Sequence, residues 1–245
     1  MTWALLLAAG FAAGVLNAAA GGGTFVTFPA LVFAGLPPVA ANVTSTIALF
    51  PGQAISAWQY RTDIASIKGL PLRAMAGVSL VFGAVGGLLL LATPERVFAA
   101  LVPWLLLFAT AVFGWGSFLR KPGGSTRIGP VAVVAVQAAI AVYGGYFGGG
   151  IGFLMLAAMT LFGLSDIHAM NGAKILFATL MNVAAVAVFL FSPAIAWWPA
   201  LLVGLGGLAG GFAGPLLAKR VPAKAVRGFV VAVGFAMAAL FFVRG

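Results

Sequence analysis

Residues 21–36 read GGGTFVTFPALVFAGL, and residues 148–164 read GGGIGFLMLAAMTLFGL. Both stretches begin with three glycines, continue as a short apolar run and end in Gly-Leu. Polar residues then recur at one constant offset, as Asn42 and Asn171, Ser45 and Lys174, and Gln53 and Asn182. Gly83, Gly86 and Gly87 recur as Gly207, Gly210 and Gly211. A duplicated hydrophobic sequence interrupted by glycines is typical of secondary transporters.

The composition is that of a membrane protein. Hydrophobic residues make up 63% of the chain and charged residues only 7%, and the mean hydropathy is +1.18. Because so few charges cannot cover a soluble domain, we expect an all-α polytopic fold with about 8–10 membrane segments. The predicted segments are residues 2–20, 40–60, 72–92, 97–119, 129–147, 169–191, 197–218 and 228–243, with half-helices at 24–34 and 151–162.

The repeat divides the chain into two halves of one membrane domain, residues 1–120 and 128–245. Each half is expected to hold a glycine-interrupted pair, made of a helix and a half-helix, followed by three transmembrane helices. Residues 2–20 resemble a secretory signal, but no basic region precedes them and their counterpart at 129–147 lies in mid-chain. We therefore keep them as the first membrane helix.

The basic residues predict the orientation of the segments, because Lys and Arg mark cytoplasmic loops. They gather in three connections, at Arg61, Lys68 and Arg73; at Arg120, Lys121 and Arg127; and at Lys219, Arg220, Lys224 and Arg227. The connections at 93–96 and 192–198 are poor in them and are expected outside, where Trp104, Trp197 and Trp198 suit an aromatic belt. Equivalent segments then cross in opposite directions, which predicts an inverted-topology repeat with both termini outside. Whether the glycine-interrupted segments span or re-enter stays open.

The triple glycines predict breaks in membrane helices, since each glycine costs about 1 kcal/mol relative to alanine inside a helix. A break inside a bilayer is tolerated only where protein or a water-filled cavity surrounds the freed backbone groups. The N–H groups that open each half-helix would form an anion site in that cavity. The candidate residues are Gly21, Gly22, Gly23, Thr24, Gly148, Gly149 and Gly150. Close helix packing through small residues is the alternative, and it is preferred for Gly83, Gly86, Gly87 and their counterparts.

Polar residues inside the apolar segments supply the other candidate ligands, which are Asn42, Thr44, Ser45, Asn171 and Lys174. Either asparagine also suits a helix N-cap. Lys174 lies within an apolar stretch, where a cation costs at least about 2–3 kcal/mol. A bound anion, an ion pair with Asp166 and snorkelling to the membrane surface all remain open. Gln53 and Asn182 are secondary candidates that touch substrate or bridge helices.

The carboxylates are Asp63, Glu95 and Asp166, and each lies in or beside a connection. The sequence therefore does not favour a proton relay through acidic residues inside the membrane. His168, the lone histidine, would suit proton coupling or is incidental. Without cysteine or a cluster of ligands or nucleophiles, the sequence predicts no metal site, no cofactor and no enzymatic activity. The net charge of +10 is spread over loops, which predicts membrane orientation rather than nucleic-acid binding.

The chain resembles the TauE/SafE family of sulfite and organosulfonate exporters over essentially its whole length. The resemblance rests on the run from Gly21 to Pro29, the Gly-Leu-Pro-Pro at 35–38, the Ala-Asn-Val-Thr-Ser at 41–45, and their echo at 148–174. The second repeat departs from this pattern, with Leu156 in place of the proline and Ala173-Lys174 in place of Thr44-Ser45. The resemblance implies a permease of the bacterial inner membrane that moves small sulfur-containing anions.

These observations predict a secondary transporter that works by alternating access around a midplane site between the two halves. Its partners would be a small anionic substrate, the lipid bilayer and a coupling ion, either a proton or sodium. A homodimer is left open. The alternatives are a passive channel for an anion or neutral solute, a permease for a different organic anion or a metal ion, and a non-transporting membrane subunit.

Overall fold

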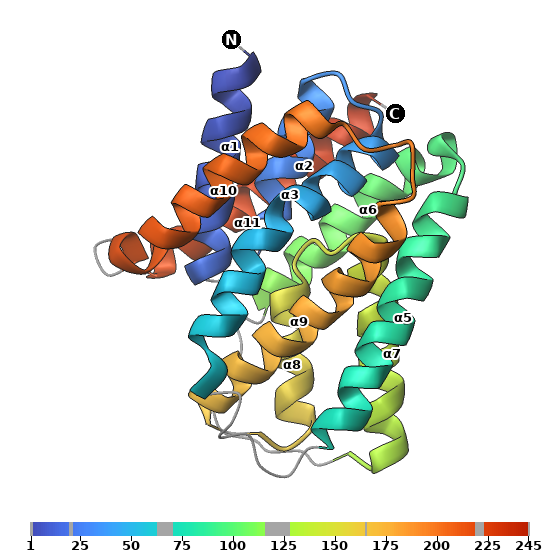
Figure 1. Cartoon of the computed structure of the whole chain (residues 1–245), viewed down its shortest axis with the longest axis vertical. Helices are drawn as coiled ribbons and strands as arrows, with labels where there is room; N and C mark the ends of the chain where they lie inside the picture. The colour runs from blue at the N-terminus through green and yellow to red at the C-terminus, as the bar shows by residue number, and fades with distance from the viewer. Residues whose placement is uncertain are drawn as a thin grey trace.

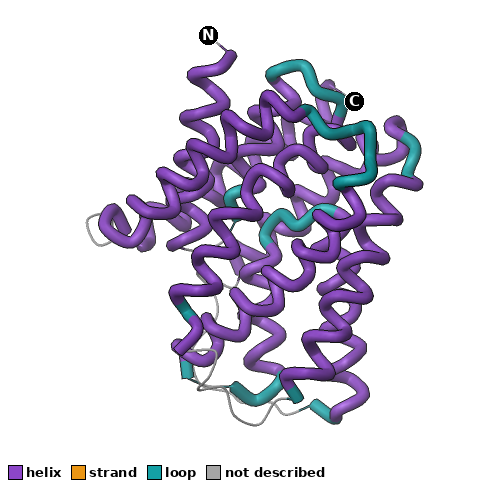
Figure 2. Tube along the Cα trace, in the orientation of Figure 1, coloured by secondary structure: helices purple, strands orange, loops and turns teal. Residues whose placement is uncertain are grey.

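The computed structural model describes residues 2–19, 22–62, 71–115, 128–164, 166–218 and 223–244. These residues form ten helices and no strand, so the predicted all-α fold is confirmed (Figure 1, Figure 2). In chain order the helices are α1 (Thr2–Ala19), α2 (Thr24–Phe33), α3 (Pro38–Gln59), α5 (Leu72–Ala92), α6 (Glu95–Gly114), α7 (Pro130–Tyr146), α8 (Ile151–Leu161), α9 (Ile167–Phe189), α10 (Trp197–Ala218) and α11 (Ala223–Arg244).

Most helices lie close to the predicted segments. α5 matches residues 72–92 at both ends, and α2 and α8 have the lengths expected of half-helices, 10 and 11 residues. α11 begins at Ala223 rather than at 228, because alanine and lysine continue a helix readily beyond its apolar part. α6 ends at Gly114, and the end predicted at 119 lies outside the described residues.

Three of the described helices are long and apolar enough to cross a membrane, namely Leu72–Ala92, Glu95–Val112 and Ala169–Phe189. Shorter apolar helices are Thr2–Asn17, Thr24–Phe33, Pro130–Tyr146, Ile151–Leu161, Trp197–Ala213 and Val231–Val243. α3 has 22 residues but belongs to neither group, because its polar side chains lower its mean hydropathy. Large apolar side chains stand on the outside, as at Phe191, which is 91% exposed. Such a surface suits contact with lipid tails.

The two half-helices end in the same way. At the end of α2 the N–H of Leu36 donates to the carbonyl five residues earlier, at 3.1 Å, and at the end of α8 the N–H of Leu164 does the same at 3.0 Å. The preceding Gly35 and Gly163 have φ angles of 97° and 89°. This is the Schellman arrangement, in which a left-handed residue lets the chain turn back on the last helical carbonyls. It explains why Gly-Leu closes both copies of the motif.

The helices of the two halves contact each other reciprocally. α1 packs along α10, and its counterpart α7 packs along α5. In the same way α5 packs on α9 and α10 packs on α3, whereas α3 meets α9 and α6 meets α11. Figure 1 shows α3 and α9 running in opposite directions, because α3 ends at the lower end of the molecule, where α9 begins. Exchanging the halves therefore reproduces the pattern of contacts. That the halves cross a bilayer in opposite directions stays a prediction.

Glycines let the paired helices approach backbone to backbone. A Cβ atom at Gly210 of α10 would lie 2.0 Å from the carbonyl oxygen of Phe11 in α1. A Cβ at Gly86 of α5 would lie 2.2 Å from the carbonyl oxygen of Val142 in α7. These glycines thus serve close packing through small residues, the reading preferred for this set from the sequence.

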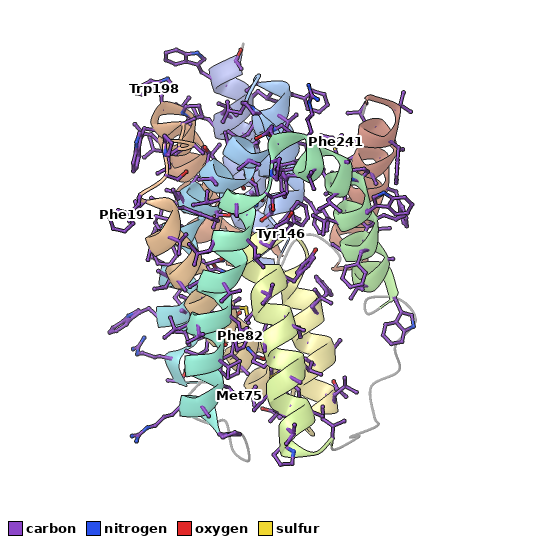
Figure 3. All side chains as sticks on the ribbon, turned by 90° about the vertical axis from the view of Figure 1, so that its right-hand side faces the viewer. Met75, Phe82, Tyr146, Phe191, Trp198 and Phe241 are labelled. Carbon is purple, nitrogen blue, oxygen red and sulfur yellow. The ribbon has the colours of Figure 1, made fainter. Side chains whose placement is uncertain are left out.

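Aromatic rings connect the two halves between the middle of the bundle and one of its ends. Phe28 of α2 lies 5.8 Å from the ring of Phe147, which follows α7, and 5.7 Å from the ring of Phe241 in α11. Phe98 of α6 lies 5.6 Å from the ring of Tyr146. Figure 3 shows Tyr146 near the middle of the molecule and Phe241 towards its upper end. These contacts pack α2, α6, α7 and α11 into one core.

Candidate functional site

A cavity of about 340 Å³ lies between the two halves, at the breaks before α2 and α8. Gly22 and Gly148, one from each triple glycine, both line it. The remaining lining residues lie in α1, α2, α3, α8 and α9, except Tyr60, which directly follows α3. They are Asn17, Thr24, Thr46, Leu49, Gln53, Ser56, Gln59, Tyr60, Ile151, Gly152, Lys174, Ile175, Ala178 and Asn182. The predicted cavity beside the glycine breaks is therefore present.

The cavity opens towards one end of the bundle. On α3 its lining runs from Thr46 to Tyr60, just beyond the end of the helix, and on α9 it runs from Asn182 back to Lys174, near the start. Figure 1 shows the end of α3 and the start of α9 at the same, lower end of the molecule. Gln59, whose side chain is exposed, lies at the mouth.

The break before α2 is held by a side chain of α1. The Oδ1 atom of Asn17 accepts hydrogen bonds from the backbone N–H groups of Gly22 (3.2 Å) and Gly23 (2.8 Å). A Cβ at Gly23 would lie 2.8 Å from the carbonyl oxygen of Ala13 and 2.8 Å from the Nδ2 atom of Asn17, so glycine is needed for this close approach to the backbone of α1. Sequence reasoning missed Asn17, although it is the one amide of the apolar segment that leads into the first break. Thr24, which begins α2, lines the cavity beside it.

The break before α8 is built differently. Gly148 and Gly150 have φ angles of 73° and 71°, which L side chains rarely adopt, whereas in the first break Gly22 has a φ of 115° and Gly23 is helical. The hydroxyl of Tyr143 donates to the carbonyl of Gly149 at 2.8 Å. A Cβ at Gly149 would lie 2.6 Å from the ring of Phe147, so this glycine faces packed side chains, and only Gly148 of the three lines the cavity.

Among the described residues that line the cavity, Lys174 is the one basic residue, and its side chain is only 9% exposed. Within the described part of the chain, no residue forms a hydrogen bond or an ion pair with its ammonium group. The carboxylate of Asp166 accepts instead from the N–H of Ala169 at 2.8 Å, so the proposed Asp166 ion pair is not found among these residues. The deep burial also disfavours snorkelling.

Gln53 and Asn182 meet where the two halves face each other. The Nδ2 atom of Asn182 donates to Oε1 of Gln53 at 2.5 Å, across a sequence separation of 129 residues. Each residue is the repeat counterpart of the other, so this bond connects equivalent points of α3 and α9. Both residues also line the cavity. Bridging helices and facing substrate are therefore compatible roles for this pair.

The predicted ligands Asn42, Thr44 and Ser45 at the start of α3 do not line the cavity, although the next residue, Thr46, does. Asn42 donates from Nδ2 to the carbonyl of Tyr146 at 2.9 Å. Thr44 accepts at Oγ1 from the N–H of Ala196 at 3.1 Å, and the hydroxyl of Ser45 lies 2.6 Å from Oγ1 of Thr27. All three predicted ligands are buried and join α3 to its neighbours.

The N-cap alternative for the two asparagines is wrong. α3 is preceded by Pro37, and the N–H of Val39 in its first turn donates to Oε1 of Glu95 at 2.9 Å. α9 is capped by its own Asp166. Asn42 and Asn171 therefore lie past the helix starts, because a proline or an aspartate five residues earlier already begins each helix.

The other predicted ligands are placed as follows. Asn171 is half-buried in α9 and does not line the cavity, and neither do Gly23 and Gly150. Gly21 and the side chain of His168 lie outside the described residues. The described residues contain no group of three or more His, Cys, Asp or Glu side chains that could hold a metal ion.

An apolar helical bundle whose broken helices border a central cavity with a buried cation and several polar side chains defines a membrane protein of the transporter class. The chain matches the family described as Sulfite exporter TauE/SafE over residues 6–241. It belongs to this family of membrane transporters, and the resemblance predicted from the sequence is confirmed.

Relatives with the same kind of name match nearly the whole chain. It is 34% identical to a probable membrane transporter protein, ORF9, of a Sinorhizobium species, over 96% of this chain and 90% of the relative. It is 29% identical to a probable membrane transporter protein of Haemophilus influenzae, over 96% and 92%. With the probable membrane transporter protein YfcA of Escherichia coli K12 it shares 28%, over 93% and 84%. No solved structure matches the chain.

Proposed function

We propose that this protein is a secondary transporter for a small anion and that the anion binds in the central cavity beside Lys174. The observation that carries the proposal is a lysine, 9% exposed, that lines the cavity and has no counter-ion among the described residues. Burying such a cation in a membrane helix costs at least about 2–3 kcal/mol. A bound anion offsets this cost, which gives the site its preference for negative charge.

The broken helices add to the preference. The starts of α2 and α8 both lie at the cavity, where Thr24 and Ile151 line it. The N-terminus of a helix carries a partial positive charge and free N–H groups, so anions are stabilised there. The family description points to sulfite, an organosulfonate or a related sulfur-containing anion as the substrate.

The proposed mechanism is alternating access between two inverted halves in the bacterial inner membrane, with both termini outside. Two observations support it. The halves contact each other reciprocally, and Figure 1 shows the N- and C-termini at the same end of the molecule. Among the described residues the lining of the cavity reaches the end of α3 at Tyr60, whereas Phe189, its counterpart at the end of α9, is fully buried. If the end of α9 opened and the end of α3 became packed, the site would be exposed on the other side of the membrane. A proton or sodium gradient would drive this cycle.

The test is substrate uptake by the purified chain in liposomes, with sulfite and methanesulfonate as probes. Lys174→Met should lower uptake by about 10–100-fold, because a hydrogen bond to a charged group contributes about 1.5–3 kcal/mol. Lys174→Arg keeps the charge and should retain part of the activity. Arg73→Met removes an exposed charge outside the cavity and serves as the matched control. Uptake unchanged in Lys174→Met would reject the proposed site.

The same preparation separates the alternatives. Flux that saturates and supports counterflow is expected of a carrier, whereas linear flux at channel rates would indicate a pore. Transport by the chain alone would exclude a non-transporting subunit. A metal ion as cargo is the poorer fit, because among the described residues the one charged side chain that lines the cavity is a lysine and none is a carboxylate.

A further inference from the structure

The start of α2 is already occupied by an oxygen atom. The Oδ1 atom of Asn17 accepts from the N–H groups of Gly22 and Gly23, at 3.2 and 2.8 Å, and both Asn17 and Gly22 line the cavity. A bound anion would use the same kind of contact, since an anion at a helix N-terminus accepts from the first free N–H groups. Asn17 therefore makes within the chain the contact that a ligand oxygen would make.

The second half provides a contrast. At the break before α8, the side-chain bond comes from Tyr143, which donates to the carbonyl of Gly149. Counted back from the triple glycine, the position in α7 that corresponds to Asn17 is Gly144, which has no side chain, and neither Gly145 nor Tyr146 beside it carries a carboxamide. Among the described residues, only the α2 side has a side-chain oxygen that accepts from the N–H groups of a glycine break. The repeat itself thus does not require Asn17.

The side chain also has room to leave. Asn17 lies in the last turn of α1, is half-buried and borders a cavity of about 340 Å³. Lys174 lines the same cavity and is nine-tenths buried without a partner among the described residues, which independently marks this space as a place for negative charge.

We infer that the Asn17 carboxamide is a placeholder for the transported anion: its oxygen holds the N–H groups of Gly22 and Gly23 while the cavity is empty and gives way to an anion oxygen on binding. This inference rests on the proposed function and names a further residue that determines affinity. The placeholder keeps the freed backbone groups paired inside the membrane, where unpaired groups are costly. Because its oxygen is uncharged, an anion makes the stronger, charge-assisted bond and displaces it.

A purely structural cap is the competing explanation, and two substitutions separate them. Asn17→Asp places a fixed negative charge on the same two N–H groups, so it should compete with the anion. Asn17→Ala removes the competitor and leaves the N–H groups open. A placeholder predicts opposite outcomes for these variants, whereas a structural cap predicts that the alanine variant loses affinity because the start of α2 is no longer held.

The experiment measures the dissociation constants of sulfite and methanesulfonate for the purified full chain in detergent, with thermal melts to confirm that each variant is folded. We expect Asn17→Asp to bind at least about tenfold more weakly than the wild type and Asn17→Ala to bind at least as tightly. Gln59→Glu, which adds the same charge at the exposed mouth of the cavity, is the matched control for a general field effect and should weaken binding less than Asn17→Asp.

Weaker binding by folded Asn17→Ala, or a loss in Asn17→Asp no larger than that in Gln59→Glu, would overturn the inference while leaving the transporter proposal in place. Failure of the wild type to bind either anion would instead be a failure of the proposed function. Hydrogen exchange at the backbone of residues 22–24 gives a readout in the protein itself. Asn17→Ala should exchange faster there, and added sulfite should restore protection if an anion oxygen takes the vacated position.

Discussion

α3 and α9 are repeat counterparts, yet their C-terminal turns have opposite environments. Ser56 and Tyr60, at the end of α3, line the cavity. The residues 129 positions later, Ala185 and Phe189 of α9, are fully buried in apolar packing. The two helices thus share their place in the repeat but differ in their side chains. The end of α3 borders a cavity, whereas the end of α9 is closely packed. A duplicated sequence of this kind can provide two equivalent routes to the cavity, one along each half. Side-chain packing decides which of the two is open.

The closed end is joined by specific polar contacts. The N–H of Ala196, in the connection between α9 and α10, donates to Oγ1 of Thr44 at 3.1 Å. The amide of Asn42 donates to the carbonyl of Tyr146 at 2.9 Å. These bonds connect the start of α3 in the first half to two segments of the second half. Alternating access requires them to break, so they offer the sharpest way to test the difference between the two ends.

The largest effect is expected from fixing the closed end covalently. The chain contains no cysteine, so the pair Thr44→Cys and Ala196→Cys would be the only thiols present. The contact at 3.1 Å between the backbone of Ala196 and the side chain of Thr44 makes the two residues neighbours, and a disulfide or a short bifunctional thiol cross-linker between them should lower uptake in liposomes by more than about tenfold. The reason is that the route along the second half cannot open while the link holds. Uptake is measured before and after oxidation.

Reducing agent should restore uptake, and each single cysteine variant should be insensitive to oxidant. Full activity of the linked protein would show that this end does not open during transport. In that case the two ends of the cavity would differ in structure but not in function.

A smaller effect is expected on the free energy of unfolding when the equivalent aromatic residues Tyr60 and Phe189 are replaced. Phe189→Ala should destabilise the fold by about 3–5 kcal/mol, because it empties a fully buried position. Tyr60→Ala removes a side chain that borders the open cavity and should cost less than about 1 kcal/mol. Both are measured by unfolding in detergent under the same conditions. Equal losses at the two positions would contradict the assignment of one end as packed and the other as hollow.

The smallest effect concerns the two helix starts. α9 is capped by its own Asp166, whereas the first turn of α3 uses Glu95 from α6. Asp166→Ala should cost about 1 kcal/mol, and Asp166→Asn should cost much less because asparagine caps equally well. Glu95→Ala should cost a similar amount to Asp166→Ala, and it should also loosen the contact between α6 and α3. Unfolding midpoints in detergent give the comparison, and a neutral Asp166→Ala would show that the cap carries no stability.

Several features of the fold could be predicted because they follow from local chemistry. A triple glycine breaks a membrane helix wherever it stands, so the short lengths of α2 and α8 were expected. Gly-Leu marks the turn that closes each half-helix. A polar surrounding for Lys174 was also expected, because a lysine within an apolar stretch is costly, but the sequence left open whether it binds an anion, pairs with Asp166 or snorkels.

Other features of the candidate site could not be predicted, because they depend on which helices meet. Asn42, Thr44 and Ser45 have the same character in the sequence as the residues that line the cavity, but the neighbours of α3 absorb their hydrogen bonds. Asn17 looked like one polar residue in an apolar helix, and only the fold of α1 against α2 places its oxygen on the N–H groups of the break. The role of a polar group is set by the partner that reaches it.

The sequence by itself determined the membrane setting, the duplication, the places where helices break and the family. Composition, glycine runs and spacing act through short-range physics that is the same in any fold. The tertiary structure alone decided that Gln53 meets Asn182, that the cavity follows α3 rather than the end of α9, and that Asn17 fills the start of α2. These outcomes depend on contacts between segments far apart in the chain, where close packing admits one arrangement of side chains and excludes the others.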